Sequence, residues 1–406
     1  MTARVFDVVL LGATGFAGRH AAVRLAEAAP QDLRWAVAGR RPEALEAFAS
    51  KHGCGVVAAD VDDAASMKAL AESTRVLLST AGPFARLGPP VVEACVNAGT
   101  HYADITGEVT FMRPMIDRFH ARATAEGTAI LPASGFDSVP AEVATLVAME
   151  EADRRGVRLE RLQTVYRLRG GLNGGTLASA IQILREGDRR LLADPFSLCP
   201  GADPAPGERR ALGDPTRPTF DPTGGRHVAP FFMAAINRRV VRRLIELARA
   251  GDAPAVPEGL TSTLAEGFRY DEYQSVSKGR GWLAAWLTTG MLGAGAALLS
   301  TRPGAALARR FGPSPGEGPS DEVLQDGLTR AKTTAFVEGG DPFTISQDMA
   351  GDPGNVATVR ILVEVGLALA AEEAQGGGVI TPMSALGRRL VERLMATGGH
   401  DVLIDE

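Results

Sequence analysis

Three glycines near the N-terminus have the spacing of a loop that holds a dinucleotide. Gly12, Gly15 and Gly18 stand at every third position of the segment GATGFAG, with Thr14 and Phe16 between them. The first glycine permits a tight turn, the second lets the backbone approach a pyrophosphate, and the third lets a helix pack closely on a strand. The helix that follows would direct free N–H groups at the phosphates. These residues therefore predict a nicotinamide cofactor and hydride transfer.

Two arginines indicate which dinucleotide is bound. Arg40 and Arg41 follow the apolar segment 33–38 and Gly39. An acidic residue at the end of this strand would hydrogen-bond the ribose 2′-hydroxyl of NAD, whereas a guanidinium group suits the 2′-phosphate of NADP. The sequence thus predicts NADP(H), with Arg40 and Arg41 as phosphate ligands. The alternative is that both arginines are solvated surface residues.

The elements that must position this loop follow an alternating pattern. Residues 5–11 are apolar and β-branched, as in a buried strand, and residues 19–29 form an expected helix that ends before Pro30. Further strands are expected at 33–38, 55–60, 76–80, 101–105 and 128–132, with helices at 64–72, 89–98 and 110–126. Strands that alternate with helices form a parallel, doubly wound sheet. The predicted fold class is α/β, with an N-terminal Rossmann domain over residues 1–140.

Six segments are expected to surround one ligand crevice, because ligands of such sheets bind beyond the carboxyl ends of the strands. The segments are residues 12–18, Arg40, Asp60, 81–84, 104–108 and 134–138. We expect Asp60 to contact the adenine edge. Ala81, Gly82 and Pro83 are expected to approach the nicotinamide ribose. The alternative for each is a loop that only caps a strand.

After Pro140 the sequence pattern changes. Alternating strands are expected at 162–168, 268–277 and 333–337, with helices at 176–192 and 231–248. We predict a second, α+β substrate domain over residues 141–375. A final helix over 384–395, within the C-terminal segment 376–406, is expected to pack back on the first domain. The segment 194–225, rich in Pro, Gly and Asp, is expected to be mobile over a cleft.

Several motifs together resemble the saccharopine dehydrogenase-like NAD(P)-binding family. They are GATGFAG at 12–18, AGPF at 81–84, HYADITGE at 101–108, PASGFDSVP at 132–140, GGTLAS at 174–179, GDPG at 351–354 and GGVITP at 377–382. The resemblance spans most of the chain and implies the fold of that family. One departure is Asn355, which stands where an aromatic residue is expected after the DPG.

Within that family, the chain most resembles the trans-acting enoyl reductase branch. The features are its length, the apolar run near 282–301 and the segment GPSPGEGPS at 312–320. Members of that branch are associated with the reduction of a double bond in polyketide-derived lipids. The resemblance therefore implies an NADP(H)-dependent reductase whose substrate is a hydrophobic acyl chain, either a small molecule or bound to a carrier.

Residues 282–301 carry no charge over twenty positions, about the length that crosses a bilayer. Basic residues and tryptophans that would suit a membrane interface flank or begin the run, namely Lys278, Arg280, Arg302, Trp282 and Trp286. A single span would place parts of one enzyme on opposite sides of a membrane. The three glycines and five alanines of the run also permit close packing. We therefore favour a buried or interfacial element, with an apolar wall beside the nicotinamide, over a span.

Reduction of an activated C=C bond needs a hydride at the β-carbon, a donor at the carbonyl oxygen and a proton at the α-carbon. Candidate donors are the side chains of Tyr102, Asp104, Thr106, Ser134 and Ser138, and the backbone of Gly174, Gly175 and Thr176. Each also fits a helix cap or a turn, so the catalytic acid stays unassigned. None of the four tyrosines has a lysine four residues later, which argues against Tyr/Lys carbonyl reduction.

Two other functions stay open at this point. A saccharopine-type amino-acid dehydrogenase would reduce an imine and would need basic residues for substrate carboxylates. Arg169, Arg185 and Arg226 are candidates for that role. A non-catalytic, lipid-associated protein could keep a nucleotide fold as a scaffold.

The composition argues against other classes of protein. The 406 residues include 43 basic and 48 acidic ones, a net charge of −5, so no basic excess exists for nucleic-acid binding. Cys54, Cys95 and Cys199 are too scattered for a disulfide framework, and no histidine pair has a metal-ligand spacing. We expect a cytoplasmic protein without a metal. Peripheral contact with the inner face of the membrane and a homodimer are left open.

Overall fold

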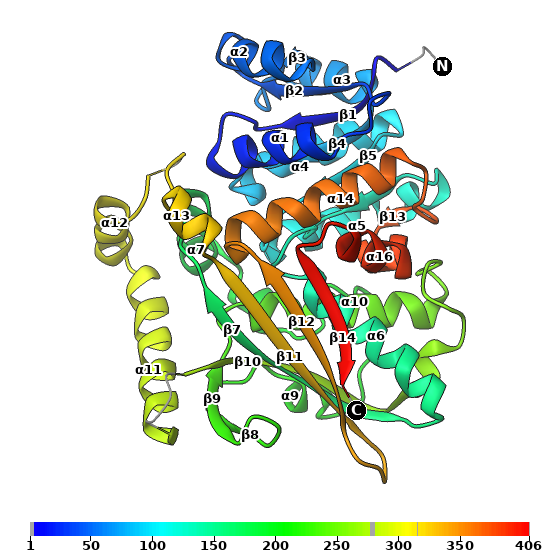
Figure 1. Cartoon of the computed structure of the whole chain (residues 1–406), viewed down its shortest axis with the longest axis vertical. Helices are drawn as coiled ribbons and strands as arrows, with labels where there is room; N and C mark the ends of the chain where they lie inside the picture. Colours follow the sequence, from blue (N-terminus) through cyan, green and yellow to red (C-terminus); the bar gives the residue numbers. More distant parts are fainter. Residues whose placement is uncertain (1–3, 277–280, 315, 406) are drawn as a thin grey trace.

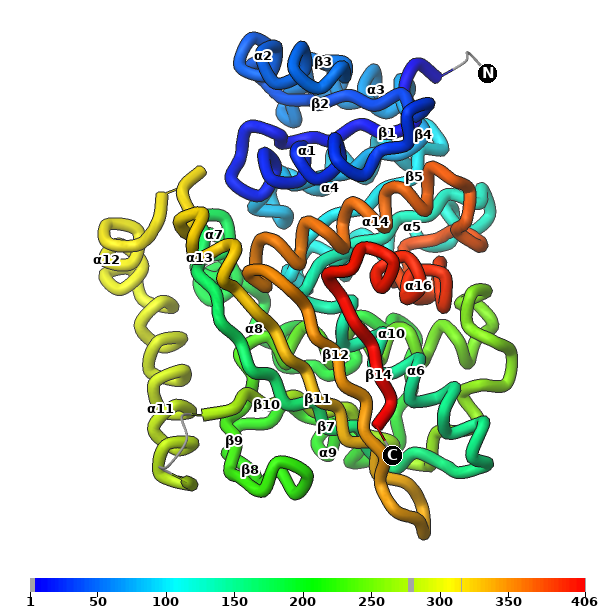
Figure 2. Tube along the Cα trace, viewed as in Figure 1, coloured from blue at the N-terminus to red at the C-terminus, as the bar shows by residue number. Residues whose placement is uncertain are grey.

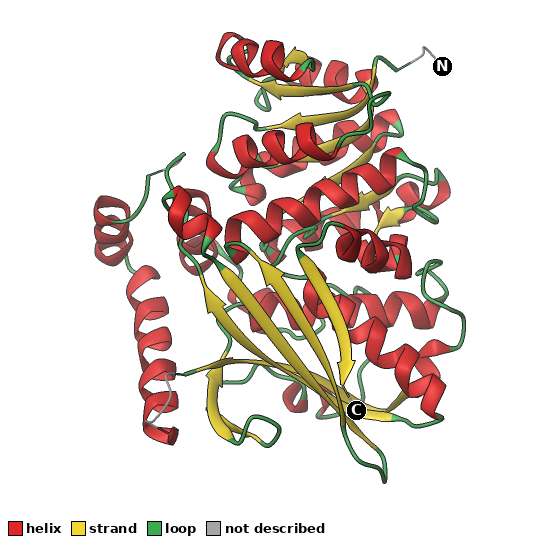
Figure 3. Ribbon diagram, viewed as in Figure 1, coloured by secondary structure: helices red, strands yellow, loops and turns green. Residues whose placement is uncertain are grey.

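The structure is a computed structural model that describes residues 4–276, 281–314 and 316–405 of the 406-residue chain. It contains two seven-stranded sheets with helices packed against them (Figure 1 and Figure 3). The first sheet is parallel, and the second is mostly antiparallel. The predicted α/β fold, with a Rossmann-like first domain and a second α+β domain, is confirmed.

Six strands of the first sheet come from the N-terminal third of the chain. They are β1 (Phe6–Leu11), β2 (Trp35–Gly39), β3 (Gly55–Ala58), β4 (Thr74–Ser79), β5 (His101–Asp104) and β6 (Ala129–Leu131). The connecting helices are α1 (Phe16–Ala28), α2 (Glu43–His52), α3 (Ala64–Ser73), α4 (Phe84–Ala98) and α5 (Val109–Ala125). Each strand expected from the apolar runs of this region is present.

The strand order of the first sheet is β13-β6-β5-β4-β1-β2-β3, with β13 (Gly378–Val379) arriving from the C-terminal part of the chain. Chain order reverses between β1 and β4, and ligands of open α/β sheets bind at this switch point. Val8 and Leu10 of β1 face one core, and Val9 and Leu11 face the other. A strand buried on both sides is apolar at successive positions, so the sequence here shows no alternation.

One face of the first sheet is covered by α14 (Thr358–Ala370), which lies across it in Figure 1. Gly366 permits this contact, because a Cβ there would lie 2.6 Å from Cδ1 of Leu78 on β4. A π-helical turn, η2 (Pro353–Ala357), leads into α14. A helix and a strand from late in the chain therefore complete the first sheet.

The second sheet has the order β14-β12-β11-β7-β10-β9-β8. Its strands are β7 (Leu159–Arg169), β8 (Thr219–Asp221), β9 (Arg226–Pro230), β10 (Leu264–Ser275), β11 (Leu328–Val337), β12 (Phe343–Ala350) and β14 (His400–Asp405). The predicted strand 268–277 is β10, and its Ser277 lies outside the described residues. The other helical elements of this half are α6 (Val139–Arg155), α7 (Gly174–Glu186), α8 (Arg189–Ala193), α9 (Glu208–Ala211), α10 (Ala234–Ala250), η1 (Leu260–Thr263) and α13 (Asp321–Gln325).

The prediction of one final helix over 384–395 is wrong. The chain forms two short helices, α15 (Pro382–Leu386) and α16 (Arg388–Ala396), which are separated at Gly387. Gly387 has a φ of +50°, and a Cβ there would lie 2.2 Å from the carbonyl oxygen of Ala255. The chain then ends as β14 at the edge of the second sheet. Residues 376–406 thus contribute a strand to each sheet.

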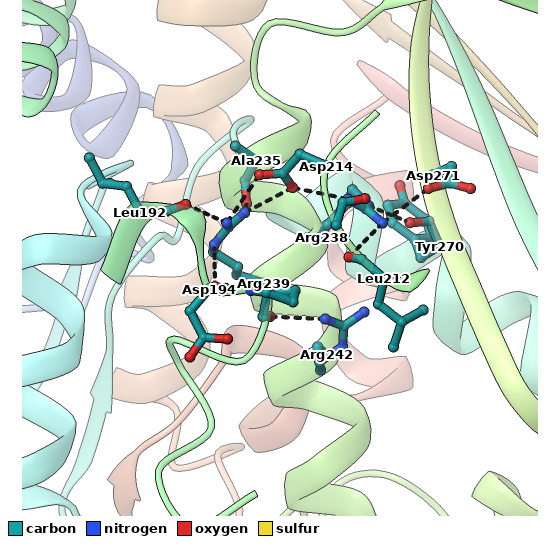
Figure 4. Close-up of polar contacts among 12 residues, drawn as sticks. Leu192, Asp194, Leu212, Asp214, Ala235, Arg238, Arg239, Arg242, Tyr270 and Asp271 are labelled. Carbon is teal, nitrogen blue, oxygen red and sulfur yellow. Dashed lines mark hydrogen bonds and ion pairs between the residues drawn. The ribbon is translucent and has the colours of Figure 1, made fainter. Parts of the chain in front are cut away.

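The segment 194–225, which we expected to be mobile, is fastened to α10 by buried arginines (Figure 4). The Arg238 guanidinium donates to the Leu212 carbonyl at 3.1 Å and to Asp214 Oδ1 at 2.9 Å. Arg239 donates to both carboxylate oxygens of Asp214, at 3.0 and 3.1 Å. Arg242 donates to the Pro195 carbonyl at 2.9 Å. These bonds hold the chain at residues 194–195 and 212–214, and the mobility of the rest of the segment stays a prediction.

The apolar run forms α11 (Gly281–Leu299), which is followed by α12 (Arg302–Phe311). Figure 2 shows both at one side of the molecule, outside the two sheets. Only 6% of the most apolar 18-residue stretch of α11 is buried, so of the two predicted forms, buried or interfacial, the buried one is wrong and the interfacial one stays a prediction. Lys278 and Arg280, which precede the helix in the sequence, lie outside the described residues.

Candidate cofactor and substrate site

The glycine loop joins β1 to α1 and lies against the end of β4. Gly12 has a φ of +90°, and a Cβ there would lie 2.9 Å from Thr80 Oγ1 and 3.0 Å from the Ala81 nitrogen. Thr80 N–H donates to the Leu11 carbonyl at 3.0 Å. A Cβ on Gly18 would lie 2.0 Å from the Gly12 carbonyl oxygen, so α1 could not pack here with a larger residue. These contacts bring residues 12–18 together with the segment 80–83.

Gly15 leaves the outer side of the loop open. It is the residue before α1, and the atom nearest to a Cβ there would be the Gly12 carbonyl oxygen, at 3.3 Å. No side chain of the described residues caps α1, so its first N–H groups are available to an anion. Thr14 beside it is exposed, whereas Phe16 is buried with its ring against Gly318. The loop therefore has the form that a pyrophosphate requires.

A pocket of about 360 Å³ extends from the glycine loop toward α2. Its lining residues are Ala13, Thr14, Arg19, Ala22, Arg41, Ala44, Leu45 and Phe48. Two of these carry a guanidinium group and none carries a carboxylate, while Leu45 and Phe48 offer apolar surface. The lining fits an adenosine that carries a 2′-phosphate. Of the two predicted arginines, Arg41 belongs to this lining and Arg40 does not.

The pocket predicts different effects for replacing Arg40 and for replacing Arg41. We expect Arg41→Ala to raise the dissociation constant for NADPH roughly 10- to 100-fold, because a charge-assisted bond to a phosphate is lost. The effect on NADH should be small, since NADH has no 2′-phosphate. Arg40→Ala is the matched control and should change NADPH binding less than about threefold. Equal losses in both variants, measured by calorimetry, would show that the pocket does not discriminate between the arginines.

Asp60 lies in the turn after β3, and its contact with the adenine edge stays a prediction. Its carboxylate accepts a hydrogen bond from the Asp62 nitrogen at 3.2 Å, and its own N–H donates to Ser66 Oγ at 3.0 Å. It shapes the turn after β3 and is not part of the pocket lining. The alternative interpretation, a residue that caps a strand, describes this geometry.

Most of the polar candidates after β5 and β6 form hydrogen bonds within the protein. Asp104 is fully buried, and its Oδ1 accepts from the backbone of Thr106 at 2.9 Å and of Ala133 at 3.1 Å. Its Oδ2 accepts from the Tyr102 hydroxyl at 2.7 Å, and burial raises the pKa of this carboxyl to about 7. Ser134 Oγ donates to the Leu131 carbonyl at 2.8 Å. These side chains tie two loops together and are already occupied.

Asp137 is the acidic residue that the sequence reasoning did not single out. It lies in the loop between β6 and α6, is half-buried, and has no polar partner among the described residues. A Cβ on Gly107 would lie 3.6 Å from Asp137 Oδ2 and 3.6 Å from the Met233 methyl group. Burial raises the pKa of Asp137 to about 6. The available signal was its position at the carboxyl end of a strand, within the segment 134–138.

Aromatic side chains form an apolar cluster next to this carboxyl group. The ring of Phe136 packs edge-on against Tyr166 at 6.0 Å, and Tyr166 stacks on Phe231 at 4.4 Å. Met233 packs against the same cluster. Phe232, beside Phe231, is 55% exposed. Asp137 thus stands beside a mostly buried apolar cluster, in which Met233 from the second domain is half-buried.

The segment 174–179 opens α7 and is joined to the first domain through Glu108. The buried Glu108 carboxylate accepts from the Phe84 nitrogen at 3.0 Å, the Ala85 nitrogen at 2.7 Å and Ser179 Oγ at 2.6 Å. Gly174 N–H donates to the Glu317 carbonyl at 3.0 Å. Thr176 N–H donates to Asn173 Oδ1 at 2.9 Å. Two of the three N–H groups suggested for a substrate carbonyl are therefore used within the protein.

Asn355, which departs from the expected aromatic residue, belongs to a buried polar network. Its Oδ1 accepts from Asn173 Nδ2 at 2.6 Å, and its Nδ2 donates to Asp352 Oδ1 at 2.6 Å. Asp352 Oδ2 accepts from the Gly171 nitrogen at 2.5 Å. Because Asn173 caps α7, this network fixes the start of that helix. An aromatic residue could not make these bonds.

The chain is similar to known reductases and dehydrogenases. Residues 8–131 match the family model described as the saccharopine dehydrogenase NADP binding domain. The protein Rv2449c of Mycobacterium tuberculosis, which its name assigns provisionally to the trans-acting enoyl reductases, is 35% identical over 98% of this chain and 97% of its own. The trans-acting enoyl reductase of Mycobacterium ulcerans is 32% identical over 97% of each chain.

A solved structure shows the same arrangement of both sheets. The apo saccharopine dehydrogenase (L-Glu forming) of Saccharomyces cerevisiae superposes with a TM-score of 0.53 over 98% of this chain and 100% of its own. The two sequences are 13% identical, so this likeness concerns the fold. The sequence resemblance to the saccharopine dehydrogenase-like family is confirmed by these comparisons.

Proposed function

Because this chain belongs to the trans-acting enoyl reductase family and is an NADP(H)-dependent oxidoreductase, we propose that it reduces a C=C bond conjugated to a carbonyl group in a hydrophobic acyl chain. The observation that carries this proposal is the unpaired Asp137 carboxyl group beside an apolar cluster, at the carboxyl ends of the strands. A proton donor and an apolar surface are what this reaction requires of the protein.

The first domain supplies the cofactor site in this proposal. The backbone of Gly12, Gly15 and Gly18 would hold the pyrophosphate, and Arg41 would pair with the 2′-phosphate. Ala81, which lies against Gly12, and Pro83 would lie near the nicotinamide ribose. When bound, NADPH supplies the hydride that the β-carbon of the substrate accepts.

The protein completes the reduction by delivering a proton. Asp137 in its protonated form donates its proton to the α-carbon, so the C=C bond becomes a single bond with one hydrogen added to each carbon. The carboxylate that remains is re-protonated from water, which reaches it because the residue is half-buried. The neighbouring Ser138 hydroxyl is buried, with no partner among the described residues, and lies next to this carboxyl in the sequence.

Near the Asp137 carboxyl group the half-buried Met233 and the 55% exposed Phe232 offer apolar surface, which supports an acyl chain as the substrate, free or attached to a carrier. An imine-reducing dehydrogenase would need free basic groups for substrate carboxylates. Arg169, one of the candidates for that role, lies 3.5 Å from Asp326 in an ion pair. The three cysteines are free thiols, which suits the cytoplasm that we propose as the compartment.

The direct test is NADPH oxidation by the purified chain. Enoyl thioesters of increasing chain length should be reduced, with the longer chains used at lower KM because they cover more of the accessible apolar surface of Met233 and Phe232. An α-keto acid with lysine should not be reduced. NADPH oxidation with the α-keto acid and lysine, but not with the enoyl thioesters, would replace this proposal with an imine-reducing function. NADPH binding without turnover of either would support a scaffold protein.

A further inference from the structure

The helices α11 and α12 expose a continuous set of large apolar side chains. They are Trp282, Leu283, Trp286, Leu287, Met291 and Leu298 of α11, with Leu307 and Phe311 of α12. Their exposed fractions range from 46% for Trp286 to 77% for Phe311. A soluble monomer rarely exposes so many such side chains on neighbouring elements. We call these eight side chains the apolar face.

The apolar face on α11 occupies one side of the helix. Exposed positions recur at 282–283, 286–287, 290–291, 293–294 and 297–298, which is the period of an α-helix. The opposite side holds the buried Ala284 and Ala285, where the helix packs on β9 and α7. The exposed stripe from Trp282 to Leu298 is about 24 Å long at 1.5 Å per residue. One side is therefore free and the other is occupied by protein, as in a helix that lies along a surface.

The charged residues near the apolar face in the sequence all have one sign. Between Glu272 and Glu317 the sequence has no acidic residue, although the whole chain has a net charge of −5. The basic residues of this interval are Lys278, Arg280, Arg302, Arg309 and Arg310. The three arginines on α12 are exposed and form no ion pair within the described ranges. An apolar stripe that continues into a helix with three exposed arginines is complementary to a membrane surface with anionic headgroups.

We propose that the apolar face docks side-on into the headgroup region of an anionic bilayer, without crossing it. Trp282 and Trp286 have the amphipathic rings that are enriched at this depth. A second copy of the chain is a poorer occupant, because a symmetric contact would bring two sets of these basic residues together. A span fits the structure less well than side-on docking, because α11 packs on β9 and α7 along one side.

The docking surface is connected to the cofactor site. After α12 the chain passes into residues 312–320, where Glu317 accepts from the Gly174 nitrogen at 3.0 Å. A Cβ on Gly318 would lie 2.5 Å from the ring of Phe16 in the glycine loop. If the proposed function holds, this connection keeps the membrane-facing helices close to the domain that holds the cofactor. The docking itself does not depend on the proposed reaction.

Tryptophan fluorescence tests the docking directly. The chain has three tryptophans, and the third, Trp35, is 7% exposed in the core of the first domain. The Trp35→Phe variant therefore reports on the apolar face alone. Vesicles of equimolar phosphatidylglycerol and phosphatidylcholine should shift its emission to shorter wavelength, and lipids brominated near the headgroup should quench it. An unchanged spectrum with these vesicles would overturn the proposal.

Vesicle flotation with matched variants identifies the surface. The double variant Trp286→Glu, Met291→Glu should bind the same vesicles at least about tenfold more weakly, because two large apolar groups are replaced by charge. Leu403→Glu, at a 59% exposed position on β14, is the control and should bind as the unmodified chain does. Equal flotation of both variants would overturn the proposal. A dimer of the unmodified chain would also overturn it, if light scattering without lipid shows that the double variant is monomeric and the control variant is not.

Vesicle binding and enoyl reduction are measured independently of each other. Reduction of a soluble, short enoyl thioester should continue at an unchanged rate in the double variant, because α11 does not border the glycine loop. If vesicle binding is present and no thioester is reduced, the docking surface stands and the proposed function fails. If the thioester is reduced and no vesicle binding is seen, the proposed function stands and the docking surface fails.

Discussion

Replacing Asp137 with asparagine is expected to lower kcat for enoyl reduction by roughly 10²- to 10⁴-fold, the usual range for loss of a general acid. Asparagine keeps the size of the side chain and its half-buried position, but it has no acidic proton to give to the α-carbon. The affinity for NADPH should stay within about twofold, because Asp137 is not part of the pocket that contains Arg41. The measurement is kcat together with the NADPH dissociation constant.

The pH dependence gives an independent check on this acid. Burial raises the pKa of Asp137 from the ordinary 3.8 to about 6, so the group is protonated below that pH and charged above it. The donor form is therefore lost as pH rises, and kcat/KM of the unmodified enzyme should fall above about pH 6. Asp137→Asn should lose this dependence. A profile that is the same in both proteins would remove Asp137 from the role.

The stability of Asp137→Asn separates a catalytic loss from misfolding. An acid whose pKa is raised by folding favours the native state at low pH, and that contribution is lost as pH rises past the unfolded value. At neutral pH the variant no longer places a charge in this half-buried site. Its Tm should therefore equal or exceed that of the unmodified chain. Asp60→Asn, in the turn after β3, is the matched control and should keep kcat within about twofold.

Replacing Glu108 with alanine is expected to destabilise the fold by about 3–5 kcal/mol, because three donors lose their acceptor and each unsatisfied buried donor costs about 1–3 kcal/mol. The carboxylate accepts from two N–H groups at the start of α4 and from the Ser179 hydroxyl of α7. Without it, three donors lose their acceptor in a fully buried position. Urea unfolding monitored by circular dichroism measures the change.

Ser179→Ala provides the graded control for Glu108. It removes only the hydroxyl that reaches Glu108 from the second domain, so the expected cost is about 1 kcal/mol. Glu108→Gln keeps an acceptor oxygen and should lie between the two. If Glu108→Ala and Ser179→Ala cost the same, the bonds to α4 contribute nothing, and the proposed link between the domains carries the whole effect.

The sequence alone predicted the first domain well, because the signals of this fold lie within short segments of the chain. Strands such as β1 are apolar at successive positions because a parallel sheet is covered on both faces, and the glycine spacing reflects contacts within a few residues. Gly12 and Gly18 make the close approaches that their positions predicted. The family resemblance rested on similar short motifs, and the comparisons confirmed it.

The roles of the polar residues depended on neighbours that are distant in the sequence. Arg40 and Arg41 are adjacent and chemically alike, yet of the two only Arg41 lines the pocket, beside Ala44, Leu45 and Phe48 of α2. Asp104 is occupied by Tyr102 and two backbone groups, whereas Asp137 is left without a partner among the described residues. No spacing rule distinguishes the two carboxyl groups.

The sequence determined which segments are apolar, and the tertiary structure decided which of them are covered. The stretches in Gly281–Leu299 and Pro353–Ala370 have nearly the same mean hydropathy, 1.4 and 1.3, but 6% of the first and 83% of the second is buried. Hydropathy measures the tendency of a segment to leave water, which a sheet, a bilayer or a partner satisfies equally well. Gly366 lets the second approach Leu78 of the first sheet, while α11 meets protein on one side only.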